Sequence, residues 1–261
     1  MTLLKHELKQ SKTAFIIWTL VITFMLAVCI FIYPEMKNEM DSFNEVFASM
    51  GNFSEAFGMD NLNFGTLIGF YATECGNVLG LGGAFFACLI GVAALSKEEK
   101  SSTSEFLLMH PISRKRIVTE KLIAIITQII AMNIIVLGAS LLSIAAIKES
   151  ILLKEILLLH AAYLILQLEL SFICFGISAF LSKGSIGIGI GLGTTMYFLN
   201  IVSNMTDSAK FLKYITPFGY CDGADIINET KLDFRMILIG IAFAFFGIFL
   251  AYFKYNKKDI K

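Results

Sequence analysis

The chain is poor in charged residues. Asp, Glu, Lys and Arg together make up 16% of its 261 residues, whereas hydrophobic residues make up 56%. This ratio, with a mean hydropathy of +0.74, lies outside the usual balance of soluble domains. The charges cancel to a formal net charge of zero, so the chain lacks the basic footprint of a nucleic-acid-binding protein. Composition therefore predicts an integral membrane protein with no nucleic-acid partner.

Motifs of catalysis and metal binding are also absent. The sequence contains no G-x-x-x-x-G-K-[ST] for nucleotide phosphates, no H-E-x-x-H for zinc and no G-x-S-x-G nucleophile. The three histidines (His6, His110 and His160) lie far apart, and the five cysteines include no C-x-x-C pair. We therefore expect no catalytic residues, no metal site and no nucleotide bound by this chain. A disulfide between Cys75 and Cys221 is left open, because sequence separation says nothing about geometry.

Six apolar runs are long enough to cross a bilayer, which takes about 20 residues. The predicted spans are 14–33, 76–95, 117–147, 156–181, 184–203 and 236–253. The second run begins earlier, at Thr66, and is too long for one crossing, so its first residues would extend outward or lie along the interface. We expect an all-α integral membrane protein with one transmembrane domain over residues 1–261.

The distribution of Lys and Arg predicts the orientation of these spans. With both termini inside, the inner segments hold two thirds of the 21 Lys and Arg residues, and cytoplasmic segments carry this excess in membrane proteins. We therefore expect a multi-pass protein of the cell membrane, bacterial in origin, with cytoplasmic termini. Before the first span, Leu3, Leu4 and Leu8 alternate with lysines, which predicts a short interfacial helix. The last outer segment, 204–235, predicts a broken or re-entrant structure before the final span.

The longest polar break between two apolar runs is residues 96–121, and it contains one apolar turn. Phe106, Leu107, Leu108 and Met109 form this turn, and His110 and Pro111 close it. A solvated loop does not need such a turn, whereas a short amphipathic helix that presses on a partner does. Ser113 can cap the helix that follows. The break therefore predicts a docking helix on the cytoplasmic side.

Few polar residues fall within the spans. Glu169 lies at the centre of the fourth span, with Gln167 near it and Gln128 and Asn133 at similar depth on the third. Intramembrane ionisable groups mark function by default, so these four residues are candidates for a translocation path or a protonatable switch. The alternative is a protonated Glu169 whose hydrogen bond locks helices together. The sequence leaves both interpretations open.

The polar break resembles the second cytoplasmic loop of the permease subunits of ABC-2 type transporters. That loop typically reads E…(S/T)-x-E-x-L-L-x-x-P-(I/V)-S-R-x-x-I-(V/I)-x-x-K. The matching residues are Glu98 or Glu99, Ser102, Thr103, Glu105, Leu107, Leu108, Pro111, Ile112, Ser113, Arg114, Ile117, Val118 and Lys121. The six spans, inner termini, interfacial helix and broken outer segment are also similar to that family. The resemblance covers nearly the whole chain, whereas the motif covers about a tenth of it.

The resemblance implies a dimer of permeases, formed with a second copy or a paralogue, on a cytoplasmic ABC ATPase that binds ATP and Mg²⁺. The expected coupling residues lie in the polar break and in the tight turn between the fourth and fifth spans. They are Glu98, Glu99, Glu105, Phe106, Leu107, Leu108, Met109, His110, Pro111, Arg114, Ser182 and Lys183. The Phe-rich spans, surrounded by lipid, suggest export of an apolar or amphipathic cargo such as a peptide, a bacteriocin or a drug-like molecule.

Two other classes of function make different demands on the sequence. An ion-coupled secondary transporter would use Glu169 as its proton site and would work without an ATPase or an apolar turn at 106–109. A membrane enzyme lacks a plausible set of catalytic groups. The sequence does not identify the cargo.

Overall fold

The chain is built from helices that are apolar on the faces they bury. The computed structural model describes residues 2–37, 56, 62–97, 113–181 and 186–257, and these contain no strand. The long helices are α1 (Thr2–Met36), α8 (Arg114–Ala146), α9 (Leu153–Ser178), α10 (Ile186–Met205) and α12 (Phe234–Lys257). The second hydrophobic run forms α4 (Leu67–Cys75), the π-helix η2 (Gly76–Leu81) and α5 (Gly82–Ala93) in unbroken succession.

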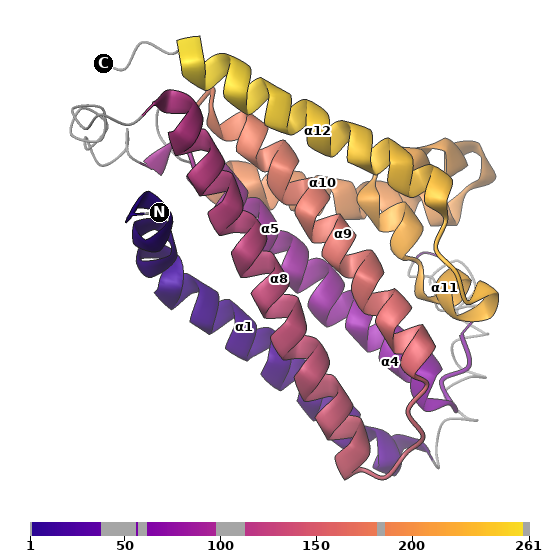
Figure 1. Cartoon of the computed structure of the whole chain (residues 1–261). Helices are drawn as coiled ribbons and strands as arrows, with labels where there is room; N and C mark the ends of the chain where they lie inside the picture. The colour runs from indigo at the N-terminus through magenta and orange to yellow at the C-terminus, as the bar shows by residue number, and fades with distance from the viewer. Residues whose placement is uncertain (1, 38–55, 57–61, 98–112, 182–185, 258–261) are drawn as a thin grey trace.

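Six helical segments of the described structure are long and apolar enough to cross a membrane, as predicted. They lie roughly side by side, and both chain termini are at one end of the bundle, called here the termini end (Figure 1). Leu3, Leu4 and Leu8 belong to the first turns of α1, which runs unbroken to Met36. The predicted interfacial helix is therefore continuous with the first span.

The second hydrophobic run contains a π-helix at its centre. The first residues of this run form α4, and Thr66 caps α4 by accepting a hydrogen bond from Gly69 N at 3.2 Å. The wider turns of η2 follow, and they change the direction in which later side chains point. The region from 67 to 93 is one candidate span, so residues 67–75 extend the helix of the second run and do not form a separate interfacial segment.

Helix α9 is central to the packing, and small residues allow other helices to approach it closely. Gly91 on α5 lies against α9: a Cβ there would be 2.5 Å from Ser171 O. On the other side of α9, a Cβ on Gly176 would be 2.6 Å from Gly247 O on α12. Such contacts are typical of transmembrane helices, where close van der Waals packing drives association.

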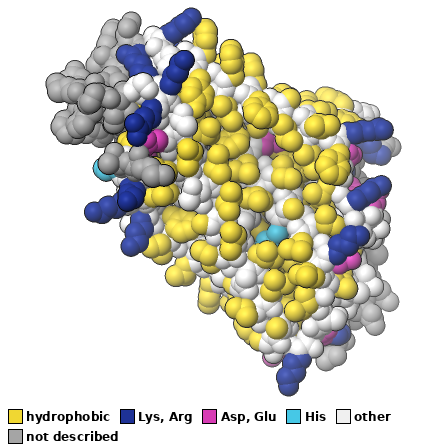
Figure 2. All heavy atoms as spheres, in the orientation of Figure 1, with side chains coloured by type: hydrophobic (Ala, Val, Ile, Leu, Met, Phe, Trp, Pro, Cys, Tyr) yellow, Lys and Arg dark blue, Asp and Glu magenta, His cyan; other side chains and the backbone are white. Residues whose placement is uncertain are grey.

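The outer surface of the bundle matches a lipid environment. Large hydrophobic side chains are exposed along α1 and α12, among them Leu20, Phe24, Phe245 and Phe249. Figure 2 shows a face that is hydrophobic over its middle, with Lys and Arg side chains gathered toward its ends. At the opposite end from the termini, the chain between α10 and α12 is broken into η3 (Asp207–Tyr214), η4 (Pro217–Cys221) and α11 (Gly223–Glu229), as predicted.

Candidate functional site

A buried ion-pair cluster links helix α1 to residues on both sides of the 98–112 segment. Lys121 Nζ lies 2.9 Å from Glu7 Oε1, and Lys97 Nζ contacts the other oxygen of the same carboxylate. Glu7 is 5% exposed and Lys121 is 1% exposed. Lys97 precedes the segment and Lys121 follows it, so one carboxylate on α1 holds both sides. We call Glu7, Lys97 and Lys121 the root cluster.

The start of α8 has further contacts with both terminal helices. Ser113 caps α8 by accepting a hydrogen bond from Arg116 N at 3.3 Å, which confirms the predicted cap. Leu4 N on α1 donates to Glu120 Oε2 at 2.9 Å, and Arg114 donates to the carbonyl of Asn256 on α12 at 3.1 Å. The first turns of α8 are therefore fixed to α1 and α12 together.

Two of the predicted path residues form a hydrogen-bonded chain that ends on the π-helix. Asn133 Nδ2 donates to Gln167 Oε1 at 2.6 Å. Gln167 Nε2 in turn donates to Leu79 O at 3.2 Å. Both side chains are buried, and the chain links α8, α9 and η2. Gln167 thus supplies a donor to a carbonyl of η2.

Glu169 is separate from this chain, although it is only two positions from Gln167. Tyr220 OH on η4 donates to Glu169 Oε2 at 2.8 Å, and the carboxylate is 3% exposed. Gly240 on α12 leaves the space that the carboxylate occupies, because a Cβ there would overlap Oε2. Glu169 therefore joins α9 to η4 and α12. The structure does not place it with Gln128, Asn133 and Gln167 in one polar patch.

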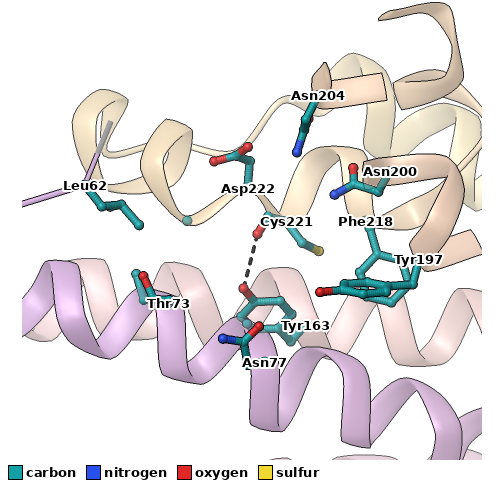
Figure 3. A pocket seen from close by; sticks show the side chains of 13 residues that line it. Leu62, Thr73, Asn77, Tyr163, Tyr197, Asn200, Asn204, Phe218, Cys221 and Asp222 are labelled. Atoms are coloured by element: carbon teal, nitrogen blue, oxygen red, sulfur yellow. Dashed lines mark hydrogen bonds between the residues drawn. The ribbon is translucent and has the colours of Figure 1, made fainter. Parts of the chain in front are cut away.

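A small polar pocket lies at the end opposite the termini, between η2, α10 and the turn into α11 (Figure 3). Its volume is about 70 Å³, enough for water or a small polar group. Amide and hydroxyl side chains share its wall with one carboxylate: Thr73, Asn77, Tyr163, Tyr197, Asn200, Asn204 and Asp222. Tyr163 OH donates to Cys221 O at 3.2 Å. Burial and the neighbouring Asp225 carboxylate raise the pKa of Asp222 above its usual range.

The comparison with known families agrees with this architecture. The family described as ABC-2 family transporter protein matches residues 1–260. The chain belongs to this family. No curated protein matches it. This ABC-2 protein is therefore a multi-pass membrane component of an ABC transporter, the permease component.

Most residues predicted to couple the permease to a partner lie outside the described residues. These are Glu98, Glu99, Glu105, Phe106, Leu107, Leu108, Met109, His110, Pro111, Ser182 and Lys183. Arg114 is described and begins α8. The apolar turn therefore stays a prediction. The contacts of the residues on either side of the 98–112 segment belong to the described structure.

Sequence reasoning missed three features of the permease. Glu7 was not singled out, because its partners lie about 90 and 114 positions away. Tyr220 was not connected with Glu169 for the same reason. The small polar pocket is assembled from short segments with no shared motif. Cys75 and Cys221 are both buried and are free thiols in this structure, so the disulfide left open by the sequence is not formed here.

Proposed function

We propose that this permease exports an apolar or amphipathic cargo, such as a peptide, a bacteriocin or a drug-like molecule, driven by a separate cytoplasmic ATPase. Family membership implies an ABC ATPase subunit, and the sequence has no phosphate-binding loop of its own. ATP and Mg²⁺ would then bind to the partner. The termini end would face the cytoplasm, as the excess of Lys and Arg in the inner segments favours.

The observation that carries this proposal is the root cluster. A docking helix at 106–109 can transmit motion only if its flanks are attached to the membrane helices. The Glu7 carboxylate attaches both flanks to α1 through Lys97 and Lys121. When the ATPase closes on ATP, a push on the loop would tilt α1 and α8 together.

The permease is proposed to work as a dimer in the lipid bilayer, with a second copy or a paralogue. Helices α1, α10 and α12 are the least buried of the six spans, so each has apolar surface available for another helix or for lipid. The path for cargo would form where two permeases meet and would open outward as the helices tilt.

Copurification with the ATPase tests the proposal. Replacing Leu107 and Leu108 with Asp should abolish copurification, because two carboxylates cannot enter an apolar groove without a large desolvation cost. Membrane insertion should be unchanged, since the loop lies outside the spans. Replacing Ser101 and Ser104 with Asp, at two positions of the same loop that are not among the residues matching the motif, is the control and should keep the ATPase bound. Undiminished copurification of the Leu107→Asp, Leu108→Asp variant would refute the assignment of the 106–109 turn as the docking site for the ATPase.

The alternative, an ion-coupled transporter with Glu169 as proton site, makes a different prediction. It requires transport by the permease alone, in vesicles without ATPase or ATP, and a dependence on the proton gradient. Export that needs the ATPase subunit would exclude it.

A further inference from the structure

The small polar pocket at the end opposite the termini brings together side chains that are remote in the chain (Figure 3). Tyr197, Asn200 and Asn204 line it from α10. They are three and four positions apart, so they share one face of the helix. Side chains of α4 and η2 face them across the pocket, and Asp222, between η4 and α11, supplies a carboxylate. The pocket therefore surrounds a negative charge with neutral polar groups.

The two oxygens of Asp222 have different roles. Oδ1 caps α11, because it accepts hydrogen bonds from Ala224 N at 2.9 Å and from Asp225 N at 3.4 Å. In the described part of the chain, Oδ2 has no hydrogen-bond donor. Burial and the Asp225 carboxylate disfavour the charged form of Asp222 more than Lys213 favours it, so its pKa lies above its usual range. A cation on Oδ2 would offset both effects and leave the cap intact.

The polar side chains that α10 contributes are also uncommitted. Among the described residues, Tyr197 OH and the Asn200 amide make no hydrogen bond, and a free amide can present either its oxygen or its nitrogen. Asn204 Nδ2 donates to Ala56 O at 3.4 Å, whereas Asn204 Oδ1 is buried and has no partner in the described structure. A buried acceptor without a donor is costly. These side chains therefore suit a ligand that carries several N–H donors.

The rest of the pocket wall is aromatic and aliphatic. Tyr163, Phe218 and the Tyr197 ring share it with Leu62 and Ala72, and the Tyr197 and Phe218 rings pack edge-on with their centroids 5.3 Å apart. Aromatic rings attract cations, and an aliphatic wall suits an alkyl group. The described residues include no group of three or more His, Cys, Asp or Glu side chains that could hold a metal ion. The lining therefore favours an organic cation.

We propose that the small polar pocket binds a primary ammonium group on a short alkyl stem. One N–H would donate to Asp222 Oδ2, and the others would donate to Tyr197 and Asn200. The volume of about 70 Å³ admits the end of a molecule, such as a free alkylamine or the amino terminus of a peptide. A quaternary ammonium is bulkier and has no N–H to donate.

The site lies at the end of the bundle that would face the outside of the cell if the termini are cytoplasmic. Its occupation by an exported peptide would rest on the proposed function. Binding of the ammonium group itself requires neither the ATPase nor a direction of transport.

Saturation-transfer difference NMR detects weak binding of a small ligand directly. The full-length permease in phosphatidylcholine nanodiscs is titrated with ethylammonium chloride at constant ionic strength, and empty nanodiscs give the background. We expect a saturable signal from the ethyl protons. Glycinamide, a minimal peptide amino terminus, should displace ethylammonium. Sodium, tetramethylammonium and N-acetylglycinamide at equal concentration should not, because each lacks the primary ammonium group.

Two variants with matched controls test the assigned contacts. Asp222→Asn keeps an oxygen to cap α11 and removes the charge, so it should weaken ethylammonium binding about tenfold. Its control is Asp225→Asn, at the neighbouring exposed carboxylate, which should weaken binding about twofold or less. Asn200→Leu should weaken binding several-fold, whereas Val202→Leu, at an exposed position of α10, should leave it unchanged.

Three results would overturn the inference: displacement of ethylammonium by sodium, equal binding of glycinamide and N-acetylglycinamide, or unchanged binding by folded Asp222→Asn. The ligand comparison uses the unaltered permease, so it stands even if a variant fails to fold. Tighter binding of glycinamide than of ethylammonium would identify a peptide amino terminus as the source of the ammonium group, and equal binding would identify a free amine.

This site and the proposed function can fail separately. An absent ethylammonium signal would refute the site and leave the export proposal intact. Ethylammonium binding by a permease that does not copurify with an ATPase would refute the proposed function and keep the site.

Discussion

Removing the Glu7 carboxylate should be among the most destabilising changes at the termini end. Glu7→Gln would leave the ammonium group of Lys121 buried, 1% exposed, and without the Glu7 carboxylate beside it. At the observed 2.9 Å separation, the attraction between unit charges is about 6 kcal/mol at an effective dielectric constant of about 20. The desolvation of both groups opposes this attraction, and breaking a buried pair from one side typically costs about 3–5 kcal/mol. We expect a loss of that size for Glu7→Gln.

The double variant separates the ion pair from the packing around it. Glu7→Leu combined with Lys121→Met replaces both charges with apolar side chains of similar volume, which is often close to neutral for a buried pair. Equilibrium unfolding by sodium dodecyl sulfate in mixed micelles, followed by Trp18 fluorescence, would give the free-energy change for each single variant and for the pair. We expect each single variant to cost several kcal/mol and the double variant to cost much less than their sum. Lys97→Gln, at the more exposed partner, should cost less than Lys121→Met.

Additive losses in this cycle would refute the argument, because they would mean that Glu7 and Lys121 do not depend on each other. A loss below about 1 kcal/mol for Glu7→Gln, the range of exposed ion pairs, would show that water reaches the cluster. In either case the root cluster could not transmit a load from the 98–112 segment to α1.

Two further predictions concern contacts of α9. Glu169→Gln keeps an oxygen that accepts from Tyr220, so its unfolding free energy should stay within about 1 kcal/mol of that of the unaltered protein. Glu169→Leu leaves the Tyr220 hydroxyl unpaired and should lower the unfolding free energy by about 1–3 kcal/mol. Loss of ATP-dependent export by Glu169→Gln in a stably folded complex would instead favour a role for its proton. Gly91→Ala should lower the yield of folded monodisperse protein in size-exclusion chromatography, because the added Cβ would be 2.5 Å from Ser171 O. Gly138→Ala is the control, since its Cβ would have nothing within 4 Å. Equal yields for the two variants would contradict the close contact of α5 with α9.

The span positions could be predicted because they depend on local properties of the chain. A run of about 20 apolar residues must form a helix in lipid, where every backbone group needs a partner, so composition alone locates it. The ends were less predictable: α1 begins at Thr2, although the span was expected from residue 14. A helix that is already formed continues through Leu3–Lys12 at little cost, because each further residue adds a hydrogen bond.

The π-helix could not have been predicted from the glycines of the second run. Two of those glycines allow close packing, since Gly83 and Gly91 lie against α9. The wider turn at Gly76–Leu81 depends on what meets it: Gln167 donates to Leu79 O, and Tyr163 occupies the space beside Gly80. Both partners come from α9, more than 80 residues later in the chain, so no local pattern records them.

At the termini end, the sequence predicted a helix but not the burial of Glu7. The alternation of Leu and Lys near the N-terminus favoured an interfacial helix, and on such a helix Glu7 would be one more solvated charge. Folding instead buries Glu7, which is 5% exposed, and pairs it with two lysines from opposite sides of the loop. An isolated carboxylate could not be buried there, and Glu7 in turn compensates the charge of the buried Lys121. The three residues therefore constrain one another, and the N-terminal turns of α1 become part of the machinery that an ATPase would move.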